Sequence, residues 1–147
     1  TINNFNPLSH RLEKIKIKSD KNYYNDSKAT NLSATLAALD SLDKNIILIL
    51  GGIDKNDSDF SILKNYLNKI KYIVLYGHSR HEIKSKISNS FNLHIYENFR
   101  DAVFKSIKIA KSEDNILLSP SCASFDQFSS YKERGNYFKE IIFNNYE

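Results

Sequence analysis

Residues 45–50 read Asn-Ile-Ile-Leu-Ile-Leu (NIILIL), and Gly51 and Gly52 follow at once. A continuous apolar run of this length predicts a strand that is covered on both faces, because a strand with one wet face would alternate apolar and polar residues. Strands of that kind belong to parallel sheets that carry helices on both faces. The run therefore decides the fold class, and we predict an α/β protein with a mostly parallel sheet.

Outward from this run, strand-like and helix-like segments alternate in both directions. The expected strands cover residues 11–19, 22–25, 45–50, 72–76, 93–96 and 115–118, and about five helices separate or follow them. Asn31 and Asn98 are expected to cap two of the helices, a third is expected to run from Phe60 to Ile70, and Pro120 is expected to end the last strand. We therefore expect six strands in one sheet, with helices on both faces.

Size and composition favour one soluble domain. The chain has 147 residues, of which 41% are hydrophobic and 26% charged, and no apolar run approaches the roughly 18 residues of a membrane-spanning helix. Residues 1–7 are polar, lack the layout of a signal peptide and are interpreted as the end of an interdomain linker, so that residues 8–147 form the domain. The absence of Met is typical of a piece of a longer protein.

Charge and cysteine content narrow the setting. Lysines are interspersed with acidic residues, so the net charge of +4 forms no basic stripe of the kind that nucleic-acid binding requires. The single cysteine, Cys122, cannot form an internal disulfide, and a reducing cytoplasm is its natural setting. We expect a cytoplasmic protein without nucleic-acid or membrane partners.

Polar segments follow three of the expected strands. They read NDSKATN over 25–31, GGIDK over 51–55 and SPSCASFD over 119–126. Ligands of open parallel sheets bind beyond the carboxyl ends of the strands, and Lys28 and Lys55 place two cations there. Thr30 and Ser124 add hydroxyls, and both segments are expected to run into helices, whose free N–H groups favour anions. We predict a rim that binds a small molecule with several carboxylates, or a phosphate.

Several bland interpretations stand beside this one. Lys28 can be explained as a solvated side chain, Lys55 as a partner of nearby aspartates, and Asp26 as a turn or helix-start residue. Ser124 is expected to cap a helix as well as to contact the ligand. Neither the P-loop nor the Gly-x-Gly-x-x-Gly pattern occurs. A domain of a larger enzyme and a stand-alone small-anion binding module both remain open from the residues alone.

Cysteine and histidine chemistry is disfavoured. Cys122 as a nucleophile would need His10 or His78 as a positioned base, and a small buried cysteine is the simpler interpretation. His78 and His81 stand three residues apart without a recognisable third ligand, so we expect no metal site in this chain.

Four segments, in this order and spacing, resemble the C-terminal domain of the Mur ligases, and within that family the branch that adds D-glutamate. They are HRLE over 10–13, NDSKATN over 25–31, LGG over 50–52 with Lys55, and SPSCASFDQFSSYKERG over 119–135. The resemblance covers nearly the whole chain and implies a Rossmann-like sheet. It also implies an ADP-forming amide ligase that adds D-glutamate to UDP-N-acetylmuramoyl-L-alanine during peptidoglycan precursor synthesis.

The resemblance implies a role for each motif residue. Thr30, Lys55, Ser124 and Tyr131 would hold the carboxylates of D-glutamate, although the family commonly has Phe where Tyr131 stands. Lys28 would be catalytic, neutralising charge in the transition state. Arg11 and Asp26 would reach the nucleotide.

The same resemblance implies that other domains complete the enzyme. ATP and Mg²⁺ would be bound mainly by a central P-loop domain and the UDP-sugar by an N-terminal domain, both in cis. The chain by itself would then be inactive, and we expect a monomer.

Overall fold

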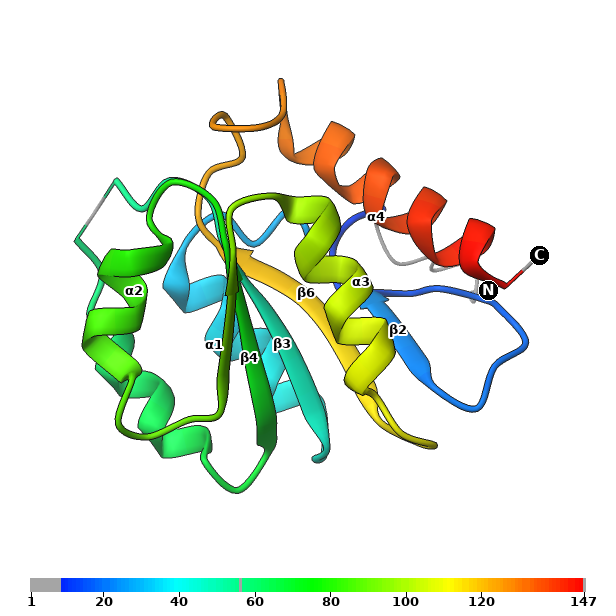
Figure 1. Cartoon of the computed structure of the whole chain (residues 1–147), viewed down its shortest axis with the longest axis horizontal. Coiled ribbons are helices and arrows are strands. Elements are labelled where there is room, and N and C mark those ends of the chain that lie inside the picture. Colours follow the sequence, from blue (N-terminus) through cyan, green and yellow to red (C-terminus); the bar gives the residue numbers. More distant parts are fainter. Residues whose placement is uncertain (1–8, 56, 147) are drawn as a thin grey trace, which may run out of the picture.

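The structure, a computed structural model, describes residues 9–55 and 57–146, so the expected linker end at 1–7 lies outside the described residues. One six-stranded sheet has the order β1-β2-β6-β3-β4-β5 (Figure 1). The five neighbouring strands β2, β6, β3, β4 and β5 are parallel, and only β1 is antiparallel to its neighbour β2. The predicted fold class is confirmed.

The elements follow the expected alternation closely. The strands are β1 (Glu13–Lys14), β2 (Asn22–Asn25), β3 (Ile46–Gly51), β4 (Ile70–Tyr76), β5 (Leu93–Tyr96) and β6 (Asn115–Ser121). The helices are α1 (Leu32–Ser41), the 3₁₀ helix η1 (Phe60–Tyr66), α2 (Arg80–Ile87), α3 (Phe99–Ile109) and α4 (Tyr131–Asn145).

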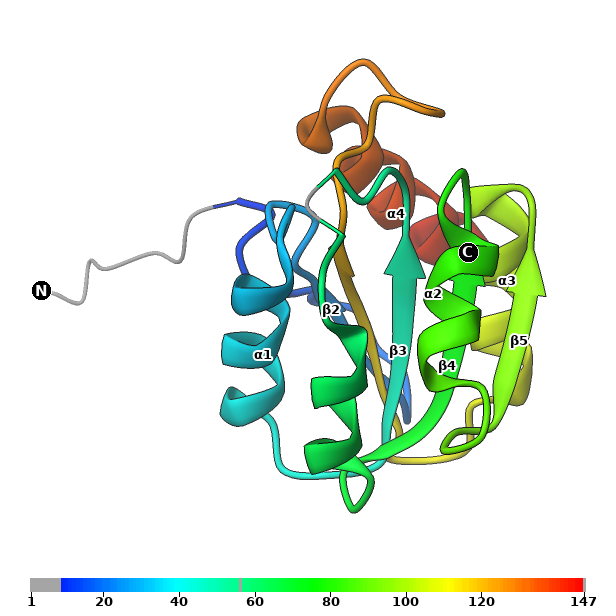
Figure 2. The same ribbon diagram turned by 90° about the vertical axis from the view of Figure 1, so that its left-hand side faces the viewer.

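Helices cover both faces of the sheet, and β3 shows why its sequence is apolar throughout. Ile47 and Ile49 pack with α3 and α4 on one face. Leu48 and Leu50 pack with α1, η1 and α2 on the other. All residues of β3 are buried, and Figure 2 shows the two helix layers on opposite sides of the strands. Within residues 9–55 and 57–146, no helix combines the length and the apolar character that crossing a membrane requires.

Three boundaries differ from the expectation. The strand predicted over 11–19 shrinks to Glu13–Lys14, because an edge strand next to the short β2 has few backbone partners. Ile70 does not end a helix but opens β4, where it pairs with Ile46. Pro120 does not end β6: the pairing with β3 shifts register between Ile49 and Gly51, and a proline is tolerated at such a bulge because its missing N–H breaks no ladder bond.

Two helix starts were predicted at the right positions. The side chain of Asn31 accepts a hydrogen bond from Ala34 N, so Asn31 caps α1 as expected. Asn98 occupies the N-cap position of α3 without a capping bond from its own side chain. The first free N–H of α3, on Phe99, donates instead to Gln127 Oε1 at 2.9 Å, which ties α3 to the segment that follows β6.

Candidate functional site

The loops after β2, β3 and β6 meet at the carboxyl ends of the parallel strands, and two neighbouring cavities open between them. The rim cavity has a volume of about 320 Å³ and lies between the three loops. The α1 groove has a volume of about 540 Å³ and lies between the β2–α1 loop and helix α1. Thr30 lines both cavities, so the two spaces share a wall.

The rim cavity gathers the residues that the resemblance assigns to the amino acid. Its walls comprise Thr30, Ile53, Asp54, Lys55, Ala123, Ser124, Phe125 and Tyr131. All four expected substrate residues are among them, although they come from three loops and the start of α4. The structure thus brings the predicted set together, while the contacts to an amino acid remain predictions.

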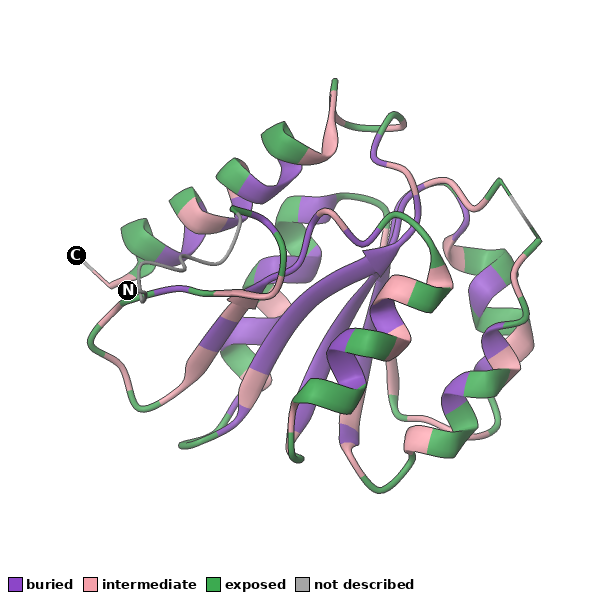
Figure 3. Cartoon of the chain, turned by 180° about the vertical axis from the view of Figure 1, so that it is seen from behind, coloured by how far each residue is buried: buried purple, intermediate pink, exposed green. Residues whose placement is uncertain are grey.

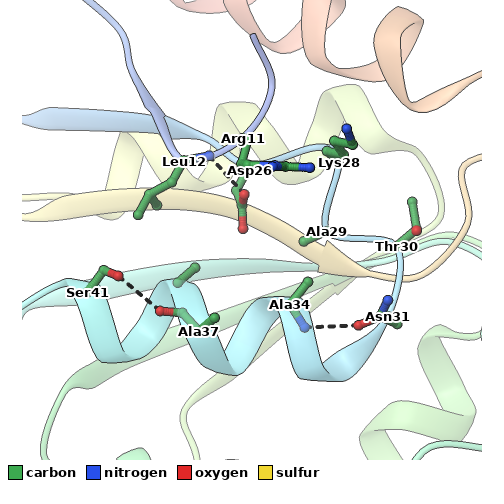
Figure 4. Close-up of a pocket in the computed structure, with 11 residues that line it drawn as sticks. Arg11, Leu12, Asp26, Lys28, Ala29, Thr30, Asn31, Ala34, Ala37 and Ser41 are labelled. Carbon is green, nitrogen blue, oxygen red and sulfur yellow. Dashed lines mark hydrogen bonds between the residues drawn. The ribbon is translucent and has the colours of Figure 1, made fainter. Parts of the chain in front are cut away.

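The α1 groove gathers the other three predicted residues. Figure 4 shows Arg11, Asp26 and Lys28 along the side of the groove that faces α1. The opposite wall consists of small residues of α1, including Ala34 and Ala37. The groove therefore combines two cationic side chains with a wall that leaves room for a bulky ligand.

Lys55 offers a free ammonium group to the rim cavity. Its side chain is exposed, and Nζ lies 5.5 Å from the centre of the Phe125 ring. Within the described part of the chain no carboxylate lies within ion-pairing distance of Lys55. The neighbouring aspartates have other partners: Asp54 accepts from Ser58, Asp57 pairs with Lys86, and Asp59 accepts from Ser61. The interpretation of Lys55 as a surface ion-pair partner is therefore wrong.

Lys28 contacts two other segments of the domain, one at His10 and one at Tyr131. Its backbone N–H donates to the carbonyl of His10 at 2.9 Å, and its Nζ lies 5.9 Å from the centre of the Tyr131 ring. Its side chain is half-buried. Lys28 thus lines the α1 groove while its ammonium group lies next to Tyr131, which lines the rim cavity.

Asp26 is a buried carboxyl group in the wall of the α1 groove. It is 5% exposed, its Oδ1 accepts from Leu12 N at 2.9 Å and its Oδ2 accepts from Ser119 Oγ at 2.7 Å. Burial raises the pKa of this carboxyl, and the hydrogen bonds from Ser119 and Leu12 and the charge of Arg11 oppose the rise. Both oxygens are thus engaged within the domain, where they fasten the Arg11–Leu12 segment to the β2–α1 loop.

The raised pKa of Asp26 predicts a pH dependence of stability. A carboxyl whose pKa is higher in the folded chain binds its proton more tightly there, so its contribution favours folding below the unfolded pKa and is lost as pH rises to the folded pKa. As pH rises above about 4, the wild type should therefore lose stability relative to Asp26→Asn, whose side chain does not titrate. Denaturation of both proteins at several pH values measures this difference in unfolding free energy. A constant difference across that range would contradict the raised pKa of Asp26.

Ser124 lies in the rim cavity without capping a helix. It is 2% exposed, and its carbonyl accepts from Gln127 N and Phe128 N in a tight turn. The next helix, α4, is capped by Ser130, whose side chain accepts from Glu133 N. The expectation that Ser124 caps a helix is therefore wrong, because this turn separates it from α4 and places Phe128 against the core.

Cys122 is a packing residue. It is fully buried, and burial raises the pKa of its thiol to about 12, so the nucleophilic thiolate is absent at neutral pH. The interpretation as a small buried cysteine is confirmed. In the described ranges, no three His, Cys, Asp or Glu side chains come close enough together to hold a metal ion.

One residue of the site region was missed from the sequence. Arg134, in the first part of α4, is fully buried and donates hydrogen bonds to the loops after β2 and β6. Figure 3 shows the buried face of α4 turned toward the sheet. A signal was present: Arg134 precedes Phe138 by one helical turn, which places it on the same apolar face as Phe138 and Ile141.

The fold and the rim define a class of protein: a Rossmann-like α/β domain that presents cations and hydroxyls beyond the carboxyl ends of its strands. The chain belongs to the Mur ligase family, because the family model described as Mur ligase, glutamate ligase domain, matches residues 10–122. That match contains Arg11, Asp26, Lys28, Thr30 and Lys55 and ends before Ser124 and Tyr131.

Two relatives align with nearly the whole chain. The UDP-N-acetylmuramoylalanine–D-glutamate ligase of Bdellovibrio bacteriovorus is 40% identical over 141 residues, which are 96% of this chain and 30% of the relative. The protein of the same name from Francisella philomiragia is 42% identical over 144 residues, 96% of this chain and 34% of the relative. The chain thus spans about a third of the length of these relatives.

A solved structure shares the fold. The murein peptide ligase of Psychrobacter arcticus 273-4 aligns with a TM-score of 0.59 at 17% identity, covering 88% of this chain and 30% of that one. At this identity the likeness supports the sheet and its helices, not the chemistry.

Proposed function

We propose that this chain is the C-terminal, amino-acid-binding domain of an ADP-forming ligase that adds D-glutamate to UDP-N-acetylmuramoyl-L-alanine in the cytoplasm. The observation that carries the proposal is the rim cavity, where Thr30, Lys55, Ser124 and Tyr131 converge. Family membership and the names of the relatives support it. Because the chain spans about a third of those relatives, the remaining domains of the enzyme would act in cis.

The rim cavity suits an amino-acid dicarboxylate. Lys55 supplies a charge that no carboxylate in the described residues neutralises, and charged hydrogen bonds to a carboxylate are among the stronger ones. The hydroxyls of Thr30 and Ser124 can donate to the same group or to the second carboxylate. Tyr131 forms an aromatic wall along the aliphatic part. The preference for the D-isomer rests on the names of the relatives.

Lys28 and Arg11 would serve the transferring phosphate. ATP, bound with Mg²⁺ mainly by the central domain, would convert the substrate carboxylate to an acyl phosphate that the amine of D-glutamate attacks. The α1 groove fits an anionic ligand because two cations line it, whereas the described residues offer no cluster of metal ligands. Lys28 lines this groove with its ammonium group next to Tyr131 of the rim cavity, so it would stabilise charge that develops between amine and phosphate.

Asp26 would contribute indirectly to the nucleotide side. Its two hydrogen bonds hold the Arg11–Leu12 segment and Ser119 in place, so its charge also keeps Arg11 next to the groove. A direct contact with the nucleotide, as the resemblance implies, would add to this function, because Asp26 also lines the groove.

Removal of the Lys55 ammonium should weaken amino-acid binding. In the intact ligase we expect Lys55→Ala to raise the KM for D-glutamate about 10- to 100-fold, the cost of a charged hydrogen bond, with a smaller change in kcat. Steady-state ADP release at varied D-glutamate measures it. Lys64→Ala, at an exposed position of η1, is the matched control, and an unchanged KM in Lys55→Ala would remove this residue from the site.

Amine selectivity in the intact protein tests the proposed function. The chain would be joined to its native upstream sequence, and ADP release measured with ATP and UDP-N-acetylmuramoyl-L-alanine. D-glutamate, L-glutamate, a diamino acid and D-alanyl-D-alanine would be offered in turn. We expect turnover with D-glutamate alone. A folded protein that binds ATP but accepts none of the amines would instead support the small-anion binding module.

A further inference from the structure

Arg134 is buried among the loops of the site without a carboxylate partner. Its side chain is fully buried, and within residues 9–55 and 57–146 no acidic group forms an ion pair with it. Burying an arginine in this way is costly unless its N–H groups are satisfied. A purely apolar side chain would fill the same space more cheaply, so the guanidinium group requires an explanation beyond packing.

The hydrogen bonds of Arg134 reach three elements. Nε donates to Ser27 Oγ at 2.9 Å and Nη2 to Ser27 O at 2.8 Å. Nη1 donates to Tyr76 OH and to Cys122 O, both at 3.1 Å. Four of the five N–H groups of the guanidinium are thus used. They join the loop after β2 and the loop after β6 to the end of β4.

The joined atoms lie next to the residues of the proposed site. Ser27 directly precedes Lys28. Its hydroxyl accepts the hydrogen bond from Arg134 and itself donates to the carbonyl of Tyr131 at 2.7 Å, so it connects Arg134 to the start of α4. The carbonyl of Cys122 lies two residues before Ser124. The strands that precede these loops are also joined by the backbone pairing of β2 with β6 and by the hydrogen bond from Ser119 Oγ to Asp26 Oδ2. Within the described residues, Arg134 is the side chain whose hydrogen bonds join Ser27 to Cys122.

We propose that Arg134 is a positioning residue that fixes the loop carrying Lys28 against the loop carrying Ser124 and against the start of α4, where Tyr131 lies. This inference rests on the proposed function for its kinetic consequences. The planar fork of the guanidinium sets the directions of all four bonds at once, which a lysine ammonium cannot do. The amino acid in the rim cavity and the ammonium group of Lys28 are thereby kept in one geometry, and an error of about 1 Å in such a geometry can cost about 100-fold in rate.

Arg134→Lys in the intact ligase is the principal test. We expect kcat to fall about tenfold or more and the KM for D-glutamate to rise, while the KM for the UDP-sugar substrate stays unchanged. Ser27→Ala removes the shared hydroxyl and should cause a smaller change in the same direction, and it replaces Arg134→Lys if that variant does not fold. Phe138→Leu, at a fully buried position of the same helix, is the control for lost stability.

A double-mutant cycle separates positioning from plain stability. If Arg134 acts through Lys28, Arg134→Lys should lower kcat less than twofold once Lys28 is alanine, because the group to be positioned is gone. A purely structural role would lower kcat by the same factor in both backgrounds, and that result would overturn the proposal.

Hydrogen exchange gives a readout that does not depend on turnover. In the intact protein, Arg134→Lys should speed amide exchange in peptides covering 26–31 and 122–131, whereas Phe138→Leu should leave both unchanged. Unaltered exchange in these peptides would overturn the proposal even for an active ligase. If Arg134→Lys speeds exchange in both loops but the wild-type protein accepts none of the amines, the linkage through Arg134 stands and only the proposed function is rejected.

Discussion

Replacing Lys28 by alanine in the intact ligase is expected to lower the rate of ADP release about 100- to 1,000-fold. The ammonium group lies 5.9 Å from the centre of the Tyr131 ring of the rim cavity, where the proposed function would have negative charge develop as the amine attacks and phosphate leaves. Fixed charges of this kind act strongly because the protein, not water, has oriented them. Stability should change by about 1 kcal/mol, the value of the half-buried contact between Lys28 and the Tyr131 ring.

Two further variants make the Lys28 experiment decisive. Lys132→Ala removes an exposed lysine of α4 next to Tyr131 that lines neither cavity, so its turnover should match the wild type. Lys28→Arg keeps the charge but changes its position, and we expect turnover between those of the wild type and Lys28→Ala. Thermal unfolding would be measured for each. Wild-type turnover in a folded Lys28→Ala protein would refute the catalytic assignment.

Gly51→Ala is expected to destabilise the domain by more than about 3 kcal/mol, enough to prevent stable folding at 37 °C. Gly51 ends the central strand β3 with φ of 152°, and a Cβ at this position would lie 2.0 Å from the carbonyl oxygen of Tyr76. That oxygen belongs to the backbone of the neighbouring strand β4, which is buried and hydrogen-bonded to β3. Neither strand can retreat, so the clash cannot be relieved locally.

Gly135 provides the contrasting case. A Cβ there would lie 2.1 Å from Nδ1 of His10, a side-chain atom. Gly135→Ala should therefore lose stability and regain part of it in combination with His10→Ala, which removes the obstacle. Urea denaturation of these variants and of Gly51→Ala measures the difference. A Gly51→Ala protein with the midpoint of the wild type would contradict the backbone clash.

The local features of the sheet could be predicted because each depends on a short stretch of sequence. The continuous apolar run of β3, the capping residue Asn31 and the polar segments after three strands each depend on neighbours in the chain. Because parallel strands share one carboxyl end, these segments had to meet at one rim. The grouping of the motif residues into two cavities then followed from the fold.

The remaining features depend on contacts between distant residues. Nothing local indicates that β6 lies between β2 and β3, or that β1 is limited to two paired residues. Ile70 has the apolar character that both a helix and a strand accept, and only its pairing with Ile46 decides between them. The partners of Arg134 could not be predicted, because Ser27 and Cys122 are remote from it in sequence.

The central position of β6 also affects how the chain folds. Asn22 and Asn115, joined by a side-chain hydrogen bond between β2 and β6, are 93 residues apart, so the sheet cannot close until nearly the whole domain has been synthesised. Contacts this distant in sequence slow folding, because the ordering of the intervening chain is not compensated until they form. While it emerges from the ribosome, the apolar strand β3 lacks one of its two neighbours and is exposed to aggregation. We therefore expect β3 to be fully paired only after residues 115–121 have been synthesised.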